Sequence, residues 1–191
     1  ADLVNIDSGS YNQPGIAAVR QRIAAFLTEN GIDTEDVETE GGPCLAARSG
    51  PPSNEGHFLL MGHMDTVFGE GETSRRPFAV ETMDGKRVGR GPGSADMKAG
   101  LVMNAFILAG FKATGTAPGP LVALYTRDEE IGSKYGRGAI EGLAAGARAV
   151  FNAEPGRKSG NVVKGRRGGS FFRATVTGRA AHAGGNPQEG R

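Results

Sequence analysis

Acidic side chains and one imidazole follow three short apolar runs of the sequence, each where the run ends. The first run ends just before His63, the second just before Glu129 and Glu130, and the third just before Glu154. Asp96 lies between the first two runs, at the end of a glycine-rich stretch. If the runs are strands of an open α/β sheet, their carboxyl ends border the crevice in which such sheets bind ligands. We therefore expect these five side chains at one rim.

Carboxylates that share a cleft repel one another unless a cation compensates their charge. One histidine with several carboxylates and no thiolate suits zinc, manganese or cobalt. A carboxylate can also bridge two metal ions with its two oxygens, so this set of ligands allows a paired site. The residue types therefore predict a centre for one or two metal ions.

Two local spacings suggest separate roles within this set. On a strand, residues i and i+2 point to the same face, so Asp65 can reach the far ring nitrogen of His63 and orient a metal-bound imidazole. Glu129 and Glu130 are adjacent and point apart. One of them can bind metal while the other takes the proton of a metal-bound water.

The elements that would position these residues follow from periodicity. Residues 57–61 and 120–125 predict strands buried on both faces, and a third strand begins at Ala149. An amphipathic helix is predicted over 16–30, with Gly31 as its stop.

Two further helices and a hairpin complete the expected elements. The segment 98–111 is apolar almost all round, which predicts a buried helix. Ser133 could cap a helix that runs toward Ala145. Residues 78–88 predict a hairpin around Asp84-Gly85.

Alternating strands and helices indicate an α/β fold with a mainly parallel sheet. After Gly168 the pattern changes, because Phe172, Ala174 and Val176 alternate with polar residues. That period of two predicts a strand with one wet face in a different subdomain. We place the metal-binding domain at 1–166 and the start of a second domain at 167–191.

Composition sets broad limits on partners and compartment. The net charge of +1 provides no strong field to recruit nucleic acid or anionic membrane, and no apolar stretch reaches transmembrane length. Cys44 is the only cysteine, so an internal disulfide is impossible. The first residues have no basic n-region and no long apolar stretch, so we expect that they are not a signal peptide. We expect a cytoplasmic protein, or a periplasmic one if a signal peptide was removed before Ala1.

Each signal also has a simpler interpretation when it is taken alone. A lone His-x-Asp is usually a surface pair, and an Asp-Glu-Glu triplet is usually a solvated turn. The stretch 89–94 lacks the spacings of a phosphate-binding loop. Lys164, Arg166 and Arg167 have no stacking aromatics beside them and indicate a solvated loop rather than a nucleic-acid patch. The metal hypothesis gains because all the weak signals lie at strand ends, in order.

The ordered motifs resemble the zinc aminoacylase/carboxypeptidase family over nearly the whole chain. They are Gly62-His63-Met64-Asp65-Thr66-Val67, the segment 91–100 around Asp96, Asp128-Glu129-Glu130-Ile131-Gly132-Ser133, and Gly178-Arg179-Ala180-Ala181-His182-Ala183-Gly184. The forms Met-Asp-Thr-Val-Phe and Asp-Met-Lys-Ala-Gly are most similar to the glutamate carboxypeptidase branch. The resemblance implies a three-layer αβα catalytic domain and the start of an α+β lid, or dimerisation, domain.

The resemblance also implies a role for each site residue. His63 and Glu154 would bind the first zinc, Glu130 the second, and Asp96 would bridge both. Asp65 would orient His63, and Glu129 would be the general base. His182 would stabilise the oxyanion in the site of a partner subunit. The peptide bond between Asp96 and Met97 would be cis.

Family members are longer, and their chain returns after the lid to supply a last histidine to the second metal. His57 opens a strand at its far end and cannot replace that histidine. We therefore expect an incomplete second site, weak or no activity of this chain alone, and dimerisation only when the lid is complete. The implied reaction is hydrolysis of an amide or peptide bond beside a C-terminal amino acid, glutamate above all, in a small peptide or N-acyl amino acid. Alternatives are an N-acyl-amino-acid deacylase or desuccinylase, or a non-catalytic remnant that binds metal or a partner.

Overall fold

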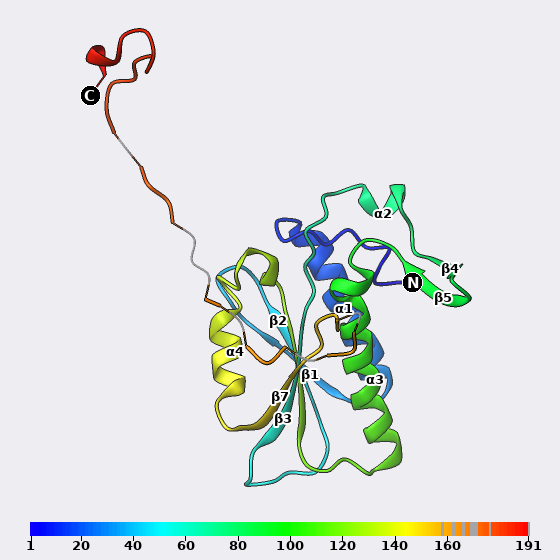
Figure 1. Ribbon diagram of the computed structural model, residues 1–191. Coiled ribbons are helices and arrows are strands. Elements are labelled where there is room, and N and C mark those ends of the chain that lie inside the picture. The colour runs from blue at the N-terminus through cyan, green and yellow to red at the C-terminus, as the bar shows by residue number, and fades with distance from the viewer. Residues whose placement is uncertain (158, 162, 166, 169–171, 176, 191) are drawn as a thin grey trace. The chain divides into compact units, whose positions relative to one another are not determined.

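The computed structural model describes residues 1–191 except 158, 162, 166, 169–171, 176 and 191 (Figure 1). Backbone contacts divide the chain into two units, Ala1–Pro155 and Gly156–Arg191. We predicted that the catalytic domain ends at residue 166 and that the lid domain begins at residue 167. This boundary stays a prediction. No helix in the described part of the chain has the length and hydrophobicity needed to span a bilayer.

The first unit is built on a five-stranded sheet with the order β1-β2-β6-β3-β7 (Figure 1). Its strands are β1 (Asp33–Val37), β2 (Cys44–Ser49), β3 (His57–His63), β6 (Leu121–Thr126) and β7 (Ala147–Asn152). Strand β3 pairs in parallel with both β6 and β7. The predicted parallel sheet is therefore correct for these three strands.

The other half of the sheet is antiparallel, which corrects the expectation of a mainly parallel sheet. Strand β1 pairs antiparallel with β2, and β2 pairs antiparallel with β6. The connection between β1 and β2 is short, and a short connection can only join antiparallel neighbours. Neither strand was predicted, because β1 is acidic and exposed and has no hydrophobic alternation.

Helices cover both faces of the sheet, so the predicted three-layer architecture is confirmed. Helices α1 (Gln13–Glu29) and α3 (Ala99–Thr114) cover one face (Figure 1) and pack their apolar side chains against it. Helix α4 (Arg137–Ala144) packs on the other face through Ala139. Short elements fill the connections: α2 (Glu72–Arg75), η1 (Ser94–Lys98), η2 (Glu129–Ile131) and, in the second unit, η3 (Pro187–Glu189).

The helix α1 begins three residues earlier than its hydrophobic pattern suggested. The side chain of Asn12 accepts a hydrogen bond from the backbone N–H of Gly15 at 3.0 Å, and Pro14 occupies the first turn. Both are favourable at a helix N-terminus, where backbone N–H groups lack partners and proline costs no hydrogen bond. The predicted hairpin is confirmed as β4 (Ala79–Met83) and β5 (Lys86–Arg90), and Asp84 and Gly85 both have positive φ.

The prediction that Ser133 caps α4 is wrong. Ser133 has a φ of 51°, and only its carbonyl contributes, by accepting from the N–H of Arg137 at 3.1 Å. The buried carboxylate of Asp128 instead accepts from the backbone N–H groups of Tyr135 and Gly136 just before the helix. A carboxylate suits this place because the helix N-terminus carries partial positive charge.

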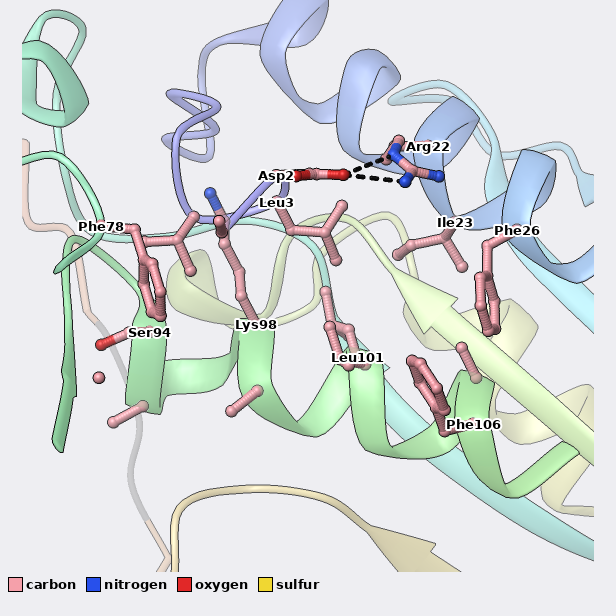
Figure 2. A pocket seen from close by; sticks show the side chains of 17 residues that line it. Asp2, Leu3, Arg22, Ile23, Phe26, Phe78, Ser94, Lys98, Leu101 and Phe106 are labelled. Atoms are coloured by element: carbon pink, nitrogen blue, oxygen red, sulfur yellow. Dashed lines mark hydrogen bonds and ion pairs between the residues drawn. The ribbon is translucent and has the colours of Figure 1, made fainter. Parts of the chain in front are cut away.

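The helix α3 is less buried than its composition suggested. Leu101 and Leu108 contact the sheet, but Val102, Met103 and Phe106 are 41%, 52% and 61% exposed. A helix in the outer layer contacts the sheet along one side only. The opposite side of α3 is apolar, and no other part of the described chain covers it. This helix borders an apolar groove of about 740 Å³, and Figure 2 shows the side chains that line it.

The groove lies between α3, α1 and the N-terminal segment. The rings of Phe26 and Phe106 approach to 4.8 Å between centroids across it, and Leu3 and Ile23 also face it (Figure 2). An ion pair between Arg22 and Asp2 lies at its edge. The groove therefore lies among the helices that cover the sheet, beside the N-terminal segment.

The predicted strand around Phe172, Ala174 and Val176 is not seen. The described residues 172–175 form no strand, and Val176 lies outside the described residues. A strand requires a neighbour for its backbone hydrogen bonds, and alternation alone cannot supply one.

Replacing Gly62 by alanine in β3 is expected to destabilise the first unit by about 1–3 kcal/mol, the usual cost of overpacking. A Cβ at this position would lie 2.8 Å from both Leu101 Cδ2 and Met97 Cε. The matched control is Gly110→Ala in α3, where a Cβ would meet nothing within 4 Å in the described part of the chain. Alanine there is expected to stabilise by up to about 1 kcal/mol through helix propensity. Thermal unfolding of both variants tests the packing, and equal effects would contradict it.

Candidate metal centre

The parallel strands place the predicted site residues at one edge of the sheet. His63 is the last residue of β3, Glu129 and Glu130 follow β6 in η2, and Glu154 follows β7. Asp96 arrives from η1, the turn that leads into α3. Its peptide bond to Met97 is cis, so that prediction is confirmed. Three neighbouring strands and one loop therefore supply the candidate ligands.

Three of these residues form a compact group. One ligand atom each from His63, Asp96 and Glu154 lies within 4.8 Å of the others. His63 Nε2 is 3.1 Å from Asp96 Oδ1 and 3.5 Å from Glu154 Oε1. The imidazole is buried, whereas the two carboxylates are partly exposed. A buried nitrogen thus faces two oxygens that solvent can reach.

These separations fit a metal ion. At bond lengths of about 2.0–2.1 Å, two ligand atoms of a tetrahedral zinc lie about 3.3–3.5 Å apart. The two separations from Nε2 are close to that range. One nitrogen and two carboxylate oxygens leave a coordination position open, as catalytic zinc sites do. The residues present therefore fit a catalytic metal ion.

His63 is held from behind by Asp65, which is fully buried. The ring nitrogen Nδ1 lies 3.2 Å from Asp65 Oδ1 and 3.0 Å from the backbone oxygen of the same residue. With Nδ1–H donating to these oxygens, Nε2 is the nitrogen that faces Asp96 and Glu154. This is the arrangement that fixes the tautomer of a metal-binding histidine.

The same carboxylate holds the chain that carries the two glutamates. Asp65 Oδ1 accepts from the N–H of Glu129 at 3.1 Å, and Oδ2 accepts from the N–H of Glu130 at 3.2 Å. The hydroxyl of Ser10 also donates to Oδ2. One buried carboxylate therefore fixes both the imidazole and the loop opposite it.

The charges around His63 call for a cation. Burial alone would lower the pKa of His63, but the hydrogen bond and negative charge of Asp65, with the charges of Glu154 and Glu129, raise that pKa to about 9. Burial alone would raise the pKa of Asp65, but its hydrogen bonds from His63 and Ser10 lower it overall. In the metal-free chain the ring proton supplies the positive charge. A divalent ion can take over that role when the proton leaves.

Glu129 and Glu130 diverge, as adjacent residues in this turn should. Glu129 Oε2 lies 3.8 Å from His63 Nε2, so its carboxylate faces the three-residue group. Burial, and then the negative charge of Asp96, raise the pKa of Glu130. Within the described residues, Glu130 is outside the group of three that lies within 4.8 Å. It borders a second hollow beside Ser10 and Thr66.

The remaining two histidines lie elsewhere. His57 opens β3 at the opposite end from His63, and its Nε2 lies 2.8 Å from the carbonyl oxygen of Leu143. His182 is exposed and belongs to the second unit, Gly156–Arg191. Its Nδ1 accepts from the N–H of Gly184 at 3.2 Å, and its own N–H donates to Asn186 Oδ1.

Sequence reasoning missed two supports of the site. Ser10 contacts Asp65 from a segment 55 residues away, and no spacing rule links them. Lys98 is buried and donates from Nζ to the carbonyl of Ile6 at 2.6 Å, tying the start of α3 to the N-terminal segment. The only sequence signal for the contact of Lys98 with Ile6 was a charged residue in the apolar segment 98–111.

Comparison with known proteins gives one family match and several relatives. The description "Peptidase family M20/M25/M40" matches residues 59–183. Carboxypeptidase G2 of Pseudomonas sp. is 33% identical over 98% of this chain and 45% of its own length. A succinyl-diaminopimelate desuccinylase of Cereibacter sphaeroides is 34% identical over 95% of this chain and 50% of its own length.

A solved structure shares the fold. The M20 family metallo-carboxypeptidase Sso-CP2 of Sulfolobus solfataricus matches with a TM-score of 0.64 at 19% identity, over 81% of this chain and 36% of that one. This chain spans about half the length of the curated relatives it matches.

Proposed function

The chain belongs to the peptidase family M20/M25/M40, and from this premise we propose that it carries the metal-binding part of an amide-bond hydrolase. The single observation that supports the proposal most is the group of His63, Asp96 and Glu154 with the Glu129 carboxylate beside it. We propose zinc as the metal, with Asp96 also reaching a second ion held by Glu130. Cobalt or manganese would suit the same ligands.

The reaction needs a proton carrier, and Glu129 is placed to be one. Bound zinc would polarise the substrate carbonyl and acidify a water molecule. Glu129 takes a proton from the attacking water molecule while the oxygen of that water adds to the carbonyl carbon. The C–N bond then breaks, and Glu129 passes the proton to the leaving nitrogen. Asp65 keeps Glu129 in place through the backbone N–H of that residue.

His182 would supply a hydrogen bond to the oxyanion. Because its Nδ1 accepts from Gly184, a neutral ring carries its proton on Nε2, which is then free to donate. We propose that the whole protein forms a homodimer through the lid domain, whose start we place at residue 167. We also propose that His182 acts in the site of the partner subunit. Mixing a Glu129→Gln protein with a His182→Ala protein should then restore activity that neither has alone. A mixture as inactive as its components would contradict action across subunits.

The proposed substrate is a small peptide or an N-acyl amino acid with a free carboxylate next to the scissile bond, glutamate above all. The motif forms resemble glutamate carboxypeptidases, and carboxypeptidase G2 is among the relatives. Desuccinylation is the second candidate, because a desuccinylase matches at similar identity.

The test is an assay of the whole protein on N-acyl-glutamate, N-succinyl-diaminopimelate and N-acyl-alanine, before and after chelation and with zinc restored. Preference for the glutamate substrate supports the first candidate, and preference for the succinyl substrate supports the second. A protein that binds zinc and hydrolyses none of them would favour a non-catalytic remnant.

A further inference from the structure

We propose that Ser10 is a positioning residue of the metal centre, which acts on the metal ligand His63 through Asp65. The hydroxyl of Ser10 donates to Asp65 Oδ2 at 2.7 Å, and both side chains are buried. That distance is short, as expected for a hydroxyl that donates to an ionised carboxylate. The inference rests on the proposed metal site and adds a residue to it.

Asp65 has no acceptor site to spare. An ionised carboxylate offers about four lone-pair sites on its two oxygens. Oδ1 faces His63 Nδ1 at 3.2 Å and the N–H of Glu129 at 3.1 Å. Oδ2 receives the N–H of Glu130 at 3.2 Å and the hydroxyl of Ser10. Ser10 therefore fills the last of four places, and its loss would leave a fully buried anion short of one donor.

The other three donors cannot compensate for that loss. Two are backbone N–H groups of η2, and the third belongs to the imidazole that Asp65 must orient. Without Ser10, the carboxylate is expected to turn toward its remaining donors on η2, because these are fixed by the backbone. That turn moves Oδ1 away from His63 Nδ1, so the ring is oriented only by the backbone oxygen of Asp65 and is held less firmly.

Ser10 is itself held in place. The N–H of Thr66 donates to the carbonyl of Ser8 at 2.9 Å, and the N–H of Asn12 donates to the carbonyl of Gly9 at 2.7 Å, so the backbone itself fixes this segment. A Cβ at Gly9 would lie 2.4 Å from the carbonyl oxygen of Phe68, so this segment runs tightly along the chain that follows β3. The hydroxyl of Ser10 thus arrives from a fixed backbone, as a positioning group must.

The experiment compares three variants of the 191-residue chain. Ser10→Ala removes the hydroxyl, and Ser10→Thr keeps one. Ser8→Ala is the matched control, because Ser8 is also buried and bonded in the same segment but touches the backbone of Met64 instead of Asp65. Zinc affinity is measured by competition with a chromophoric chelator. The absorption spectrum of bound cobalt reports ligand geometry, and thermal unfolding of the metal-free chains reports stability.

We expect Ser10→Ala to weaken zinc binding about tenfold, the lower end of the effect seen when the partners of metal ligands are removed. Its cobalt spectrum should shift. Ser10→Thr keeps a hydroxyl that can donate to Asp65, so its zinc affinity should lie closer to that of the wild type than that of Ser10→Ala does. Ser8→Ala should lower thermal stability and leave zinc affinity and the cobalt spectrum unchanged.

Two results would overturn the inference, and they differ from failure of the metal site. Wild-type zinc affinity in Ser10→Ala would show that Asp65 orients His63 without Ser10. Equal losses of zinc affinity in Ser10→Ala and Ser8→Ala would show that the loss comes only from a less stable N-terminal segment. A wild-type chain that binds neither zinc nor cobalt would instead overturn the proposed metal centre itself.

Discussion

Replacing Glu129 by glutamine in the whole protein is expected to lower turnover by about 10²- to 10⁴-fold, the usual contribution of a general base. The amide keeps the shape of the side chain and cannot take the proton of the attacking water. Glu129 is outside the group of three candidate ligands, so the variant should retain its metal. The measurements are kcat on the preferred substrate and metal content by atomic absorption.

The control for this variant is Glu141→Gln. Glu141 is an exposed carboxylate of α4 that pairs with Arg137, and its loss should leave turnover unchanged. A Glu129→Gln protein that lost its metal would make Glu129 a ligand, and one with normal turnover would remove it from the mechanism.

Replacing Asp65 by alanine is expected to weaken zinc binding about 10- to 100-fold. The variant removes the carboxylate beside His63 Nδ1, so that only the backbone oxygen of residue 65 still accepts from this nitrogen, and it leaves the N–H groups of Glu129 and Glu130 without their partner. The imidazole can then rotate and take either tautomer, so less of the population presents Nε2 to the metal. Competition with a chelator gives the affinity, and a cobalt spectrum gives the geometry.

Asp128→Ala separates this effect from a general loss of stability. Asp128 is also a buried carboxylate that accepts two backbone N–H groups, but these belong to Tyr135 and Gly136. Its loss should destabilise the chain by about 1–3 kcal/mol, the cost of leaving buried donors unpaired. Zinc affinity should change far less than in Asp65→Ala. Equal losses of affinity would show that Asp65 acts only on stability.

The parts of the fold that were predictable have strong local signals. The short apolar runs that form β3 and β6 favour a buried strand. The dipeptide Asp84-Gly85 favours a tight hairpin. Strand β1 was missed because it is acidic and exposed, and β2 was missed because its pairing with β6 joins residues distant in sequence. The outer side of α3 was misjudged because composition cannot tell which side of an apolar helix meets the sheet.

The candidate site was largely predictable because its residues follow strand ends that the topology brings together. His63 and Glu154 meet because they follow the parallel neighbours β3 and β7, and Asp96 joins them from η1. Their assigned roles remain predictions. Ser10 could not be found in the same way, because its contact with Asp65 depends on how the N-terminal segment lies against the chain after β3.

The most direct test of the central claim is calorimetric titration of zinc into the metal-stripped 191-residue chain. His63, Asp96 and Glu154 are the proposed protein ligands of the first site, and Asp96 and Glu130 are those proposed for the second. We expect one tight binding event, any second being much weaker, and we expect His63→Ala to abolish the tight event. Absence of tight binding, two equally tight sites, or tight binding that survives His63→Ala would contradict it.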